Sequence, residues 1–147
     1  MTVPASYAVR VDRMDDLDGR TAYLLWQLRE AVFVVEQQCP YLELDGRDLE
    51  PGTRHVWAAS GDTPIGYLRV LDDGHQARIG RVLVAREHRG RGIAETLLLE
   101  ALTLVGERPS RLDAQTYLAP WYTRFGYRQD GAQFVEDGIP HVPMRRP

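Results

Sequence analysis

A glycine-rich turn stands between a predicted strand, residues 79–84, and the most regular amphipathic helix of the sequence, residues 95–105. The turn reads Arg89-Gly90-Arg91-Gly92-Ile93-Ala94. Glycines let a ligand approach the backbone closely, and the free N–H groups and dipole of a helix start favour negative charge. The two arginines add cationic charge beside them. These residue types at this spacing predict a cradle for a phosphate-bearing ligand.

Two familiar phosphate-binding motifs do not fit this turn. The dinucleotide fingerprint G-x-G-x-x-G needs a third glycine where Glu95 stands, and it follows the first strand of a βαβ unit. The P-loop needs a Gly-Lys-Ser/Thr sequence, which does not follow here. A nicotinamide-dependent oxidoreductase and a P-loop nucleotide-binding protein are therefore both disfavoured.

Hydrophobic periodicity predicts the elements that must position the turn. In chain order they are a strand at 7–11, a helix from Thr21 to Cys39-Pro40, an antiparallel meander at 55–59, 65–71 and 77–84, the helix at 95–105, a strand at 111–114, a short helix at 119–125 and a closing hairpin that includes 140–144. Gly126 is expected to end the short helix as a left-handed cap.

Length and charge limit the classes of protein. A chain of 147 residues, 44% hydrophobic and 27% charged, predicts a single domain over residues 1–147. The formal net charge of -3 argues against nucleic acid as the main partner, because phosphate binding needs clustered Lys and Arg. The sequence shows no signal peptide or membrane-spanning run, so we expect a cytoplasmic protein without a membrane partner.

The sequence predicts no metal site. Its four histidines lack metal-ligand spacing, and Cys39 has no His or Lys nearby to activate it as a nucleophile. Residues 36–50 hold five carboxylates and one arginine, which predicts an acidic loop. The loop is interpreted either as a solvated surface or as a surface that attracts a cationic substrate.

The turn resembles the pyrophosphate loop of the GNAT acetyltransferase superfamily, through Arg89, Gly92 and Ala94. Residues 114–127 are similar to the second motif of that family, a helix bearing Tyr before a Phe-Gly-aromatic turn. Residues 31–37, Cys39-Pro40-Tyr41, Asp45-Gly46 and 136–141 resemble its ElaA-type branch. The resemblance covers nearly the whole chain. It implies an α/β (α+β) fold with a mixed, mostly antiparallel central sheet flanked by helices, in which a splayed strand pair forms an acetyl-CoA cleft.

The resemblance also implies which residues bind acetyl-CoA. The backbone of the strand before the turn would hold the pantetheine arm, and the turn with the helix start would hold the pyrophosphate. The residues at these positions are Val82, Leu83, Val84, Arg89, Gly90, Arg91, Gly92, Ile93, Ala94 and Glu95. The backbone N–H of Leu83 or Val84 is a candidate donor to the oxyanion.

Two side chains are candidate catalysts. By resemblance Tyr122 is the general acid for the leaving thiolate; the alternative is that Trp121, Tyr122 and Phe125 form a packed aromatic face. Glu36 is the leading candidate for the general base, directly or through water, and the alternative is an exposed helix carboxylate. Further candidates for the base are Glu43, Asp45 and His55, the last being otherwise an ordinary strand residue.

These features predict an acetyl-CoA-dependent N-acetyltransferase, in which a small-molecule or peptide amine attacks the thioester directly in a ternary complex. The alternative is a non-catalytic module that binds acyl-CoA as a sensor. The acceptor amine is left open by the sequence. A homodimer is a further expectation, because the edge of the closing strand is able to pair with a second copy.

Overall fold

The computed structural model describes residues 6–147. Its strands are β1 (Ala8–Asp12), β2 (Arg54–Ser60), β3 (Thr63–Asp72), β4 (Ala77–Val84), β5 (Ser110–Gln115), β6 (Arg128–Gln129), β7 (Phe134–Glu136) and β8 (Ile139–Arg146). Its longer helices are α1 (Gly19–Arg29), a π-helical segment (Glu30–Glu36), α2 (Ile93–Val105) and α3 (Ala119–Thr123). The predicted meander, both later helices and the closing hairpin are confirmed within a few residues.

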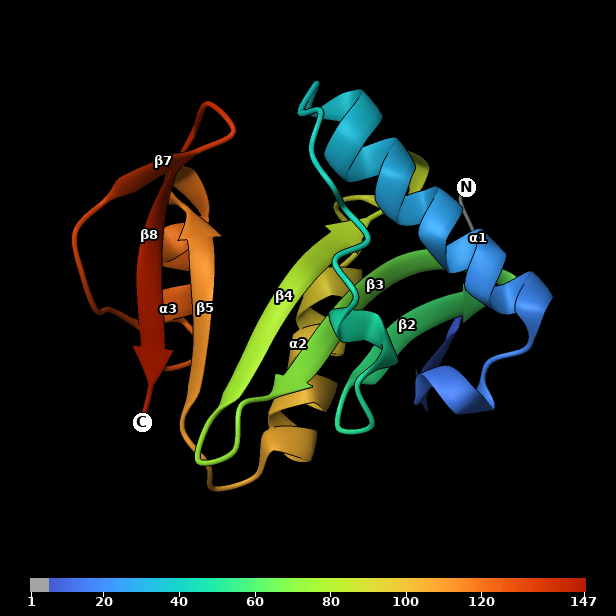
Figure 1. The fold of residues 1–147 in the computed structure, drawn as a ribbon, viewed down its shortest axis with the longest axis horizontal. Coiled ribbons are helices and arrows are strands. Elements are labelled where there is room, and N and C mark those ends of the chain that lie inside the picture. Colours follow the sequence, from blue (N-terminus) through green and yellow to red (C-terminus); the bar gives the residue numbers. More distant parts are fainter. Residues whose placement is uncertain (1–5) are drawn as a thin grey trace.

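Within residues 6–147, eight strands form one mixed sheet in the order β1-β2-β3-β4-β5-β8-β6, and β7 also pairs with β8. Neighbouring strands are antiparallel except β4 and β5. These two pair in parallel only at Ala77–Ser110 and Arg78–Arg111, and beyond that point they diverge (Figure 1). The expected splayed pair is therefore present, because the ladder between β4 and β5 stops after their first residues.

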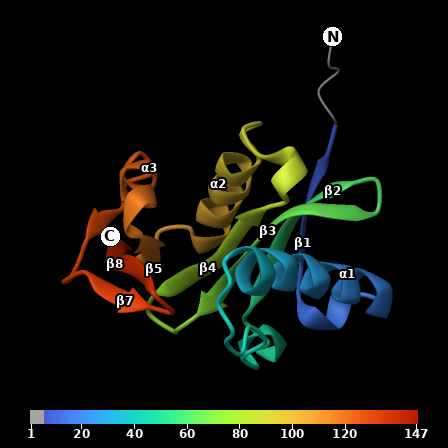
Figure 2. The ribbon, with the colours of Figure 1, turned by 90° about the horizontal axis from the view of Figure 1, so that it is seen from above.

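Helices cover both faces of the sheet. Seen from above, α2 and α3 lie on one face and α1 lies on the other (Figure 2). The core beneath α2 includes the fully buried Leu97 and Leu98, whereas α1 packs its buried Leu25 with Trp57 and Tyr67. Elements on both faces of the sheet therefore flank the gap between β4 and β5.

The first helix changes type in its second half. Asp18 caps its start by accepting a hydrogen bond from the Thr21 N–H at 2.7 Å. The sequence predicted one helix from Thr21 to Cys39-Pro40, but the structure has an α-helix to Arg29 and a π-helical turn over Glu30–Glu36. π-Helical turns occur frequently at functional sites. Hydrophobic periodicity in the sequence did not reveal this π-helical turn, because the turn depends on where the segment packs.

A β-bulge interrupts the pairing of β4 with β3. The register passes from Arg69–Gly80 to Tyr67–Leu83, so β4 carries two residues opposite the single residue Leu68. The first of them, Arg81, has a left-handed backbone with φ of 55°. Beyond the bulge, the Ala85 N–H donates to the Ile65 carbonyl at 2.8 Å. Because bonded pairs alternate along an antiparallel ladder, the peptide groups of the preceding residue, Val84, face the gap beside β5.

Candidate active site

A cavity of about 690 Å³ lies at the gap between β4 and β5. The π-helical segment, β4, β5, α3 and the hairpin of β7 and β8 all contribute to its wall. Of the residues predicted from the sequence, those that line it are Val82, Leu83, Val84, Arg89, Glu36, Tyr122 and Asp45. The structure thus brings the predicted strand, acid and base candidates into one cavity.

The remaining predicted residues, Gly90 to Glu95, lie at the start of α2 and not in the cavity wall. Gly90 and Gly92 have φ angles of 79° and 76°, and a Cβ atom on either would meet no atom within 4 Å. No side chain caps α2, and the first N–H bonded within the helix is that of Thr96, to the Gly92 carbonyl at 3.1 Å. The turn therefore leaves room and free N–H groups for a phosphate-bearing substrate.

Arg89 is engaged within the protein. Its Nε donates to the Val84 carbonyl at 3.0 Å, and its two Nη atoms donate to both oxygens of Glu36 at 2.7 and 2.8 Å. These hydrogen bonds hold the pKa of the Glu36 carboxyl below its ordinary value. Arg89 therefore braces the end of β4 against the π-helical segment, and Glu36 is an ionised carboxylate with a reduced affinity for protons.

Tyr122 belongs to the packed aromatic helix face and also reaches the cavity. Its side chain is only 6% exposed and packs edge-on against Trp121 and Tyr127, with ring centroids 4.9 and 6.1 Å apart. It also lines the cavity. Burial raises the pKa of the Tyr122 phenol, so the hydroxyl stays protonated at neutral pH. A protonated phenol on the cavity wall is able to act as a proton donor, and its catalytic role stays a prediction.

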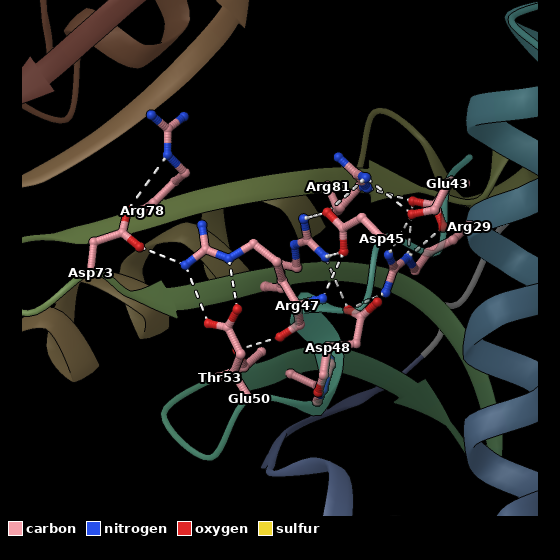
Figure 3. A network of polar contacts seen from close by, with 12 residues as sticks. Arg29, Glu43, Asp45, Arg47, Asp48, Glu50, Thr53, Asp73, Arg78 and Arg81 are labelled. Atoms are coloured by element: carbon pink, nitrogen blue, oxygen red, sulfur yellow. Dashed lines mark hydrogen bonds and ion pairs between the residues drawn. The ribbon is translucent and has the colours of Figure 1, made fainter. Parts of the chain in front are cut away.

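The interpretation of residues 36–50 as a solvated acidic loop is wrong for two of its five carboxylates. Glu43 and Asp48 are only 6% and 5% exposed. Their carboxylates, together with the partly exposed carboxylate of Asp45, form a network with arginines of α1, β3 and β4 (Figure 3). Its three closest ion pairs are Arg81–Glu43 at 2.5 Å, Arg69–Asp45 at 2.6 Å and Arg29–Asp48 at 2.7 Å. The sequence did not reveal this neutralisation, because the arginines lie 14 to 38 residues away along the chain.

Contacts with this network of carboxylates and arginines make the other candidates, Glu43, Asp45 and His55, unsuitable as the general base. Glu43 and Asp45 each accept hydrogen bonds from arginines, and a hydrogen bond from Arg69 holds the pKa of Asp45 well below its ordinary value. His55 is fully buried on β2, where Nδ1 lies 2.6 Å from the Tyr67 hydroxyl and Nε2 lies 3.2 Å from the Asp48 carbonyl. Burial lowers the pKa of His55. His55 is thus the structural strand residue of the alternative interpretation.

Several residues of the cavity wall were missed. Arg81 extends from the β4 bulge to the Glu43 carbonyl, where Nη2 donates at 3.0 Å, and its guanidinium lies 5.8 Å from the Tyr41 ring centroid. Arg78 and Asp113 line the cavity from β4 and β5, and His141 lines it from β8. A bulge and cross-strand neighbours leave no periodic signal. His141 does fall in the segment that carried the ElaA-type resemblance, and that was the available signal.

No helix among residues 6–147 is long and apolar enough to cross a membrane. Across the same residues, no three His, Cys, Asp or Glu side chains are grouped so that they could hold a metal ion.

Comparison with known proteins agrees with the geometry. The model of the acetyltransferase (GNAT) domain family matches residues 27–146. A UPF0039 protein of Mycobacterium tuberculosis is 49% identical over 137 residues, which cover 90% of this chain and 88% of that protein. Protein ElaA of Escherichia coli is 40% identical over 138 residues, covering 89% and 90%. The crystal structure of an acyl-CoA N-acyltransferase from Pseudomonas aeruginosa superposes with a TM-score of 0.92 at 39% identity, covering 97% and 100%.

The splayed strand pair, the glycine turn and these likenesses define the class of acyl-CoA-dependent N-acyltransferases. The crystal structure of Escherichia coli ElaA superposes with a TM-score of 0.91 at 35% identity, covering 97% of this chain and 100% of that one. The chain belongs to the GNAT acetyltransferase family, in its ElaA-type branch.

Proposed function

We propose that this protein transfers an acetyl group from acetyl-CoA to a primary amine, which attacks the thioester directly in a ternary complex. The observation that carries the proposal is the gap between β4 and β5, which opens beside an uncapped helix start and has Tyr122 on its wall. The membership of the GNAT family supports the use of an acyl-CoA. The proposal goes further than family membership in naming acetyl as the group transferred and a primary amine as the acceptor.

In this proposal, acetyl-CoA is bound mainly by backbone groups. Val82 and Val84 offer peptide groups to the pantetheine arm along the free edge of β4, and Leu83, whose N–H points toward β3, lies between them. The N–H groups of Ile93, Ala94 and Glu95, at the start of α2, hold the pyrophosphate. In the turn before them, Gly90 and Gly92 keep side chains away and the exposed Arg91 adds positive charge.

Two donors act on the reacting thioester. The Val84 N–H, which the ladder turns toward the gap, polarises the carbonyl and stabilises the developing oxyanion. Leu83 is the weaker of the two donors suggested by the sequence, because alternation directs its N–H toward β3. Tyr122 gives its phenolic proton to the departing thiolate, a role that its buried and protonated state supports.

Glu36 fits a bracing role better than that of a base. A base must take a proton, and both carboxylate oxygens of Glu36 already accept charged N–H groups of Arg89. In this proposal the pair fixes the end of β4 next to the acetyl-CoA cradle. The acceptor, a small-molecule or peptide amine, approaches from the part of the cavity lined by β5 and the hairpin of β7 and β8.

A panel assay tests the proposed function. The protein is incubated with acetyl-CoA and, separately, with spermidine, L-lysine, kanamycin and a peptide with a free N-terminus, while released CoA thiol is measured. Mass spectrometry then identifies the acetylated amine. We expect thiol release that depends on both the amine and the protein. Binding of acetyl-CoA in a calorimeter without thiol release from any amine would favour the sensor module instead.

A further inference from the structure

The wall of the cavity opposite α3 contains a histidine that the proposed mechanism has not used. His141 lies on β8, where its direct neighbours are Gln115 of β5 and Phe134 of β7. Direct cross-strand neighbours share one face of a sheet. The next residues of β8 and β5 on the other face, Val142 and Ala114, are buried in the core beneath α2 and α3. His141 therefore faces the cavity from the side of α1, and Tyr122 reaches it from the side of α3.

The hydrogen bond of the ring decides which nitrogen is basic. His141 Nδ1 lies 2.7 Å from the carbonyl oxygen of Ile139. A carbonyl oxygen only accepts, so Nδ1 carries the hydrogen, and in the neutral ring the lone pair is on Nε2. No hydrogen bond between described residues uses Nε2. The Phe134 ring stacks on the imidazole, with ring centroids 5.6 Å apart and an interplanar angle of 19°. This stacking fixes the orientation of the imidazole.

The other titratable groups of the cavity are less suited to take a proton. Glu36 and Asp45 are held by arginines, as described above. Asp113 accepts a hydrogen bond from Arg78 at 3.3 Å. Glu136 and Asp137 are exposed carboxylates on the hairpin of β7 and β8. The imidazole of His141 is half-buried and keeps a free lone pair on Nε2. Its orientation is fixed by the hydrogen bond to the Ile139 carbonyl and by stacking with Phe134.

We propose that His141 is the general base of the transfer, an inference that rests on the proposed function. Nε2 takes one proton from the amine nitrogen as the new N–C bond forms. The C–S bond then breaks, and the thiolate takes the phenolic proton of Tyr122. The proton on the imidazolium returns to the Tyr122 phenolate through solvent in the cavity. The sum converts an amine and acetyl-CoA into an amide and CoA thiol, with both side chains restored.

Placement on opposite faces of the sheet suits these two roles. The attacking nitrogen and the leaving sulfur are both attached to the same carbon during transfer, and an acid and a base that both lay on the same side would compete for one of them. Tyr122 and His141 lie on opposite faces of the part of the sheet formed by β5 and β8, and the divergence of β4 from β5 leaves both on the wall of one cavity.

Removal and chemical rescue of the imidazole test the assignment. His141→Ala should lower kcat with the best amine of the panel by about 10²–10⁴-fold, the usual contribution of general base catalysis. Added imidazole should restore part of that loss, and a merely structural role would not respond to it. The matched control is His75→Ala, in the exposed turn between β3 and β4, which should keep parent kcat and show no response to imidazole. Turnover of a folded His141→Ala protein within threefold of the parent, or a loss without rescue, overturns the assignment.

A measurement without turnover separates this inference from the proposed function. Long-range ¹H–¹⁵N spectra of the parent protein with ¹⁵N-labelled histidine should show His141 as the tautomer protonated at Nδ1, identified by its loss in His141→Ala. A ring protonated at Nε2 overturns the inference even if amines are acetylated. If the parent acetylates no amine of the panel, the proposed function fails, and the proposal of a general base fails with it whatever the tautomer.

Discussion

Arg89 donates hydrogen bonds to both carboxylate oxygens of Glu36 across the end of β4, with Nη···Oε distances of 2.7 and 2.8 Å. The two residues are 53 positions apart in the chain, and the sequence had assigned them to different tasks, phosphate binding and proton transfer. Their contact joins the π-helical segment to the strand that ends at the cradle. The contact therefore predicts a bracing role for Glu36, whereas the sequence had suggested that Glu36 is the general base.

Glu36→Gln should affect binding of acetyl-CoA more than turnover. The pair is partly exposed, so we expect a loss of affinity of only about two- to fivefold, and less at high salt. Because hydrogen bonding from Arg89 already lowers the pKa of Glu36, this carboxylate stays ionised through the neutral range, and its removal should leave the pH profile of kcat unchanged. Calorimetry and steady-state kinetics measure the two effects.

The control is Glu30→Gln, which removes one exposed charge from the first residue of the same π-helical segment. A large loss of kcat in Glu36→Gln that recovers as the acceptor amine deprotonates would restore Glu36 as the base, as the sequence first suggested.

Tyr122→Phe should lower kcat by about 10²–10⁴-fold, because it deletes the hydroxyl that protonates the thiolate and preserves the buried ring. The dissociation constant for acetyl-CoA should change little, since the donor acts in the transition state. Tyr23→Phe, in an exposed position of α1, is the control. A folded Tyr122→Phe variant with parent kcat, under conditions where chemistry limits the rate, would leave Tyr122 with a packing role.

Gly92→Val should weaken acetyl-CoA binding severely while the domain still folds. The position has a φ of 76° with open space around it, so a β-carbon strains the backbone and also occupies the approach to the free N–H groups of α2. Gly61→Val is matched for strain, because Gly61 has a φ of 61° and equally open surroundings in the turn between β2 and β3. Equal acetyl-CoA affinity in the two folded variants, measured by calorimetry, would argue against a pyrophosphate site at this turn.

Asp48→Asn should destabilise the protein by up to about 3–5 kcal/mol at neutral pH, because it removes one of the two carboxylate charges beside the buried Arg29 and leaves only that of Glu43. Burial alone would raise the pKa of Asp48, but hydrogen bonding and charge from Arg29 and Arg69 lower it. A lowered folded pKa contributes stability above the unfolded value of about 4, and this contribution is lost as the pH falls through the folded value.

Urea unfolding of parent and Asp48→Asn should therefore show the largest difference near pH 7 and a smaller one near pH 3. Asp62→Asn, in the exposed turn between β2 and β3, should match the parent at both values. A difference between parent and Asp48→Asn that does not narrow in acid would show that the network contributes no charge-dependent stability.

The sequence by itself determined the local elements and predicted the cradle. Alternating and helical periodicities identified the meander and the helix at 95–105, because each reports which face of one segment is buried. The turn from Arg89 to Ala94 was recognised because glycines at a helix start allow phosphate to reach the backbone. The splayed pair of β4 and β5 followed from the resemblance to the GNAT family.

Only the tertiary structure decided which charges meet. Glu43, Asp45 and Asp48 read as a free acidic surface in the sequence, because their arginine partners come from α1, β3 and β4. His141 gained its orientation from Phe134 across a strand pair and from a backbone carbonyl. Periodicity records burial within one segment, whereas the protonation of a side chain depends on neighbours that folding brings from elsewhere in the chain.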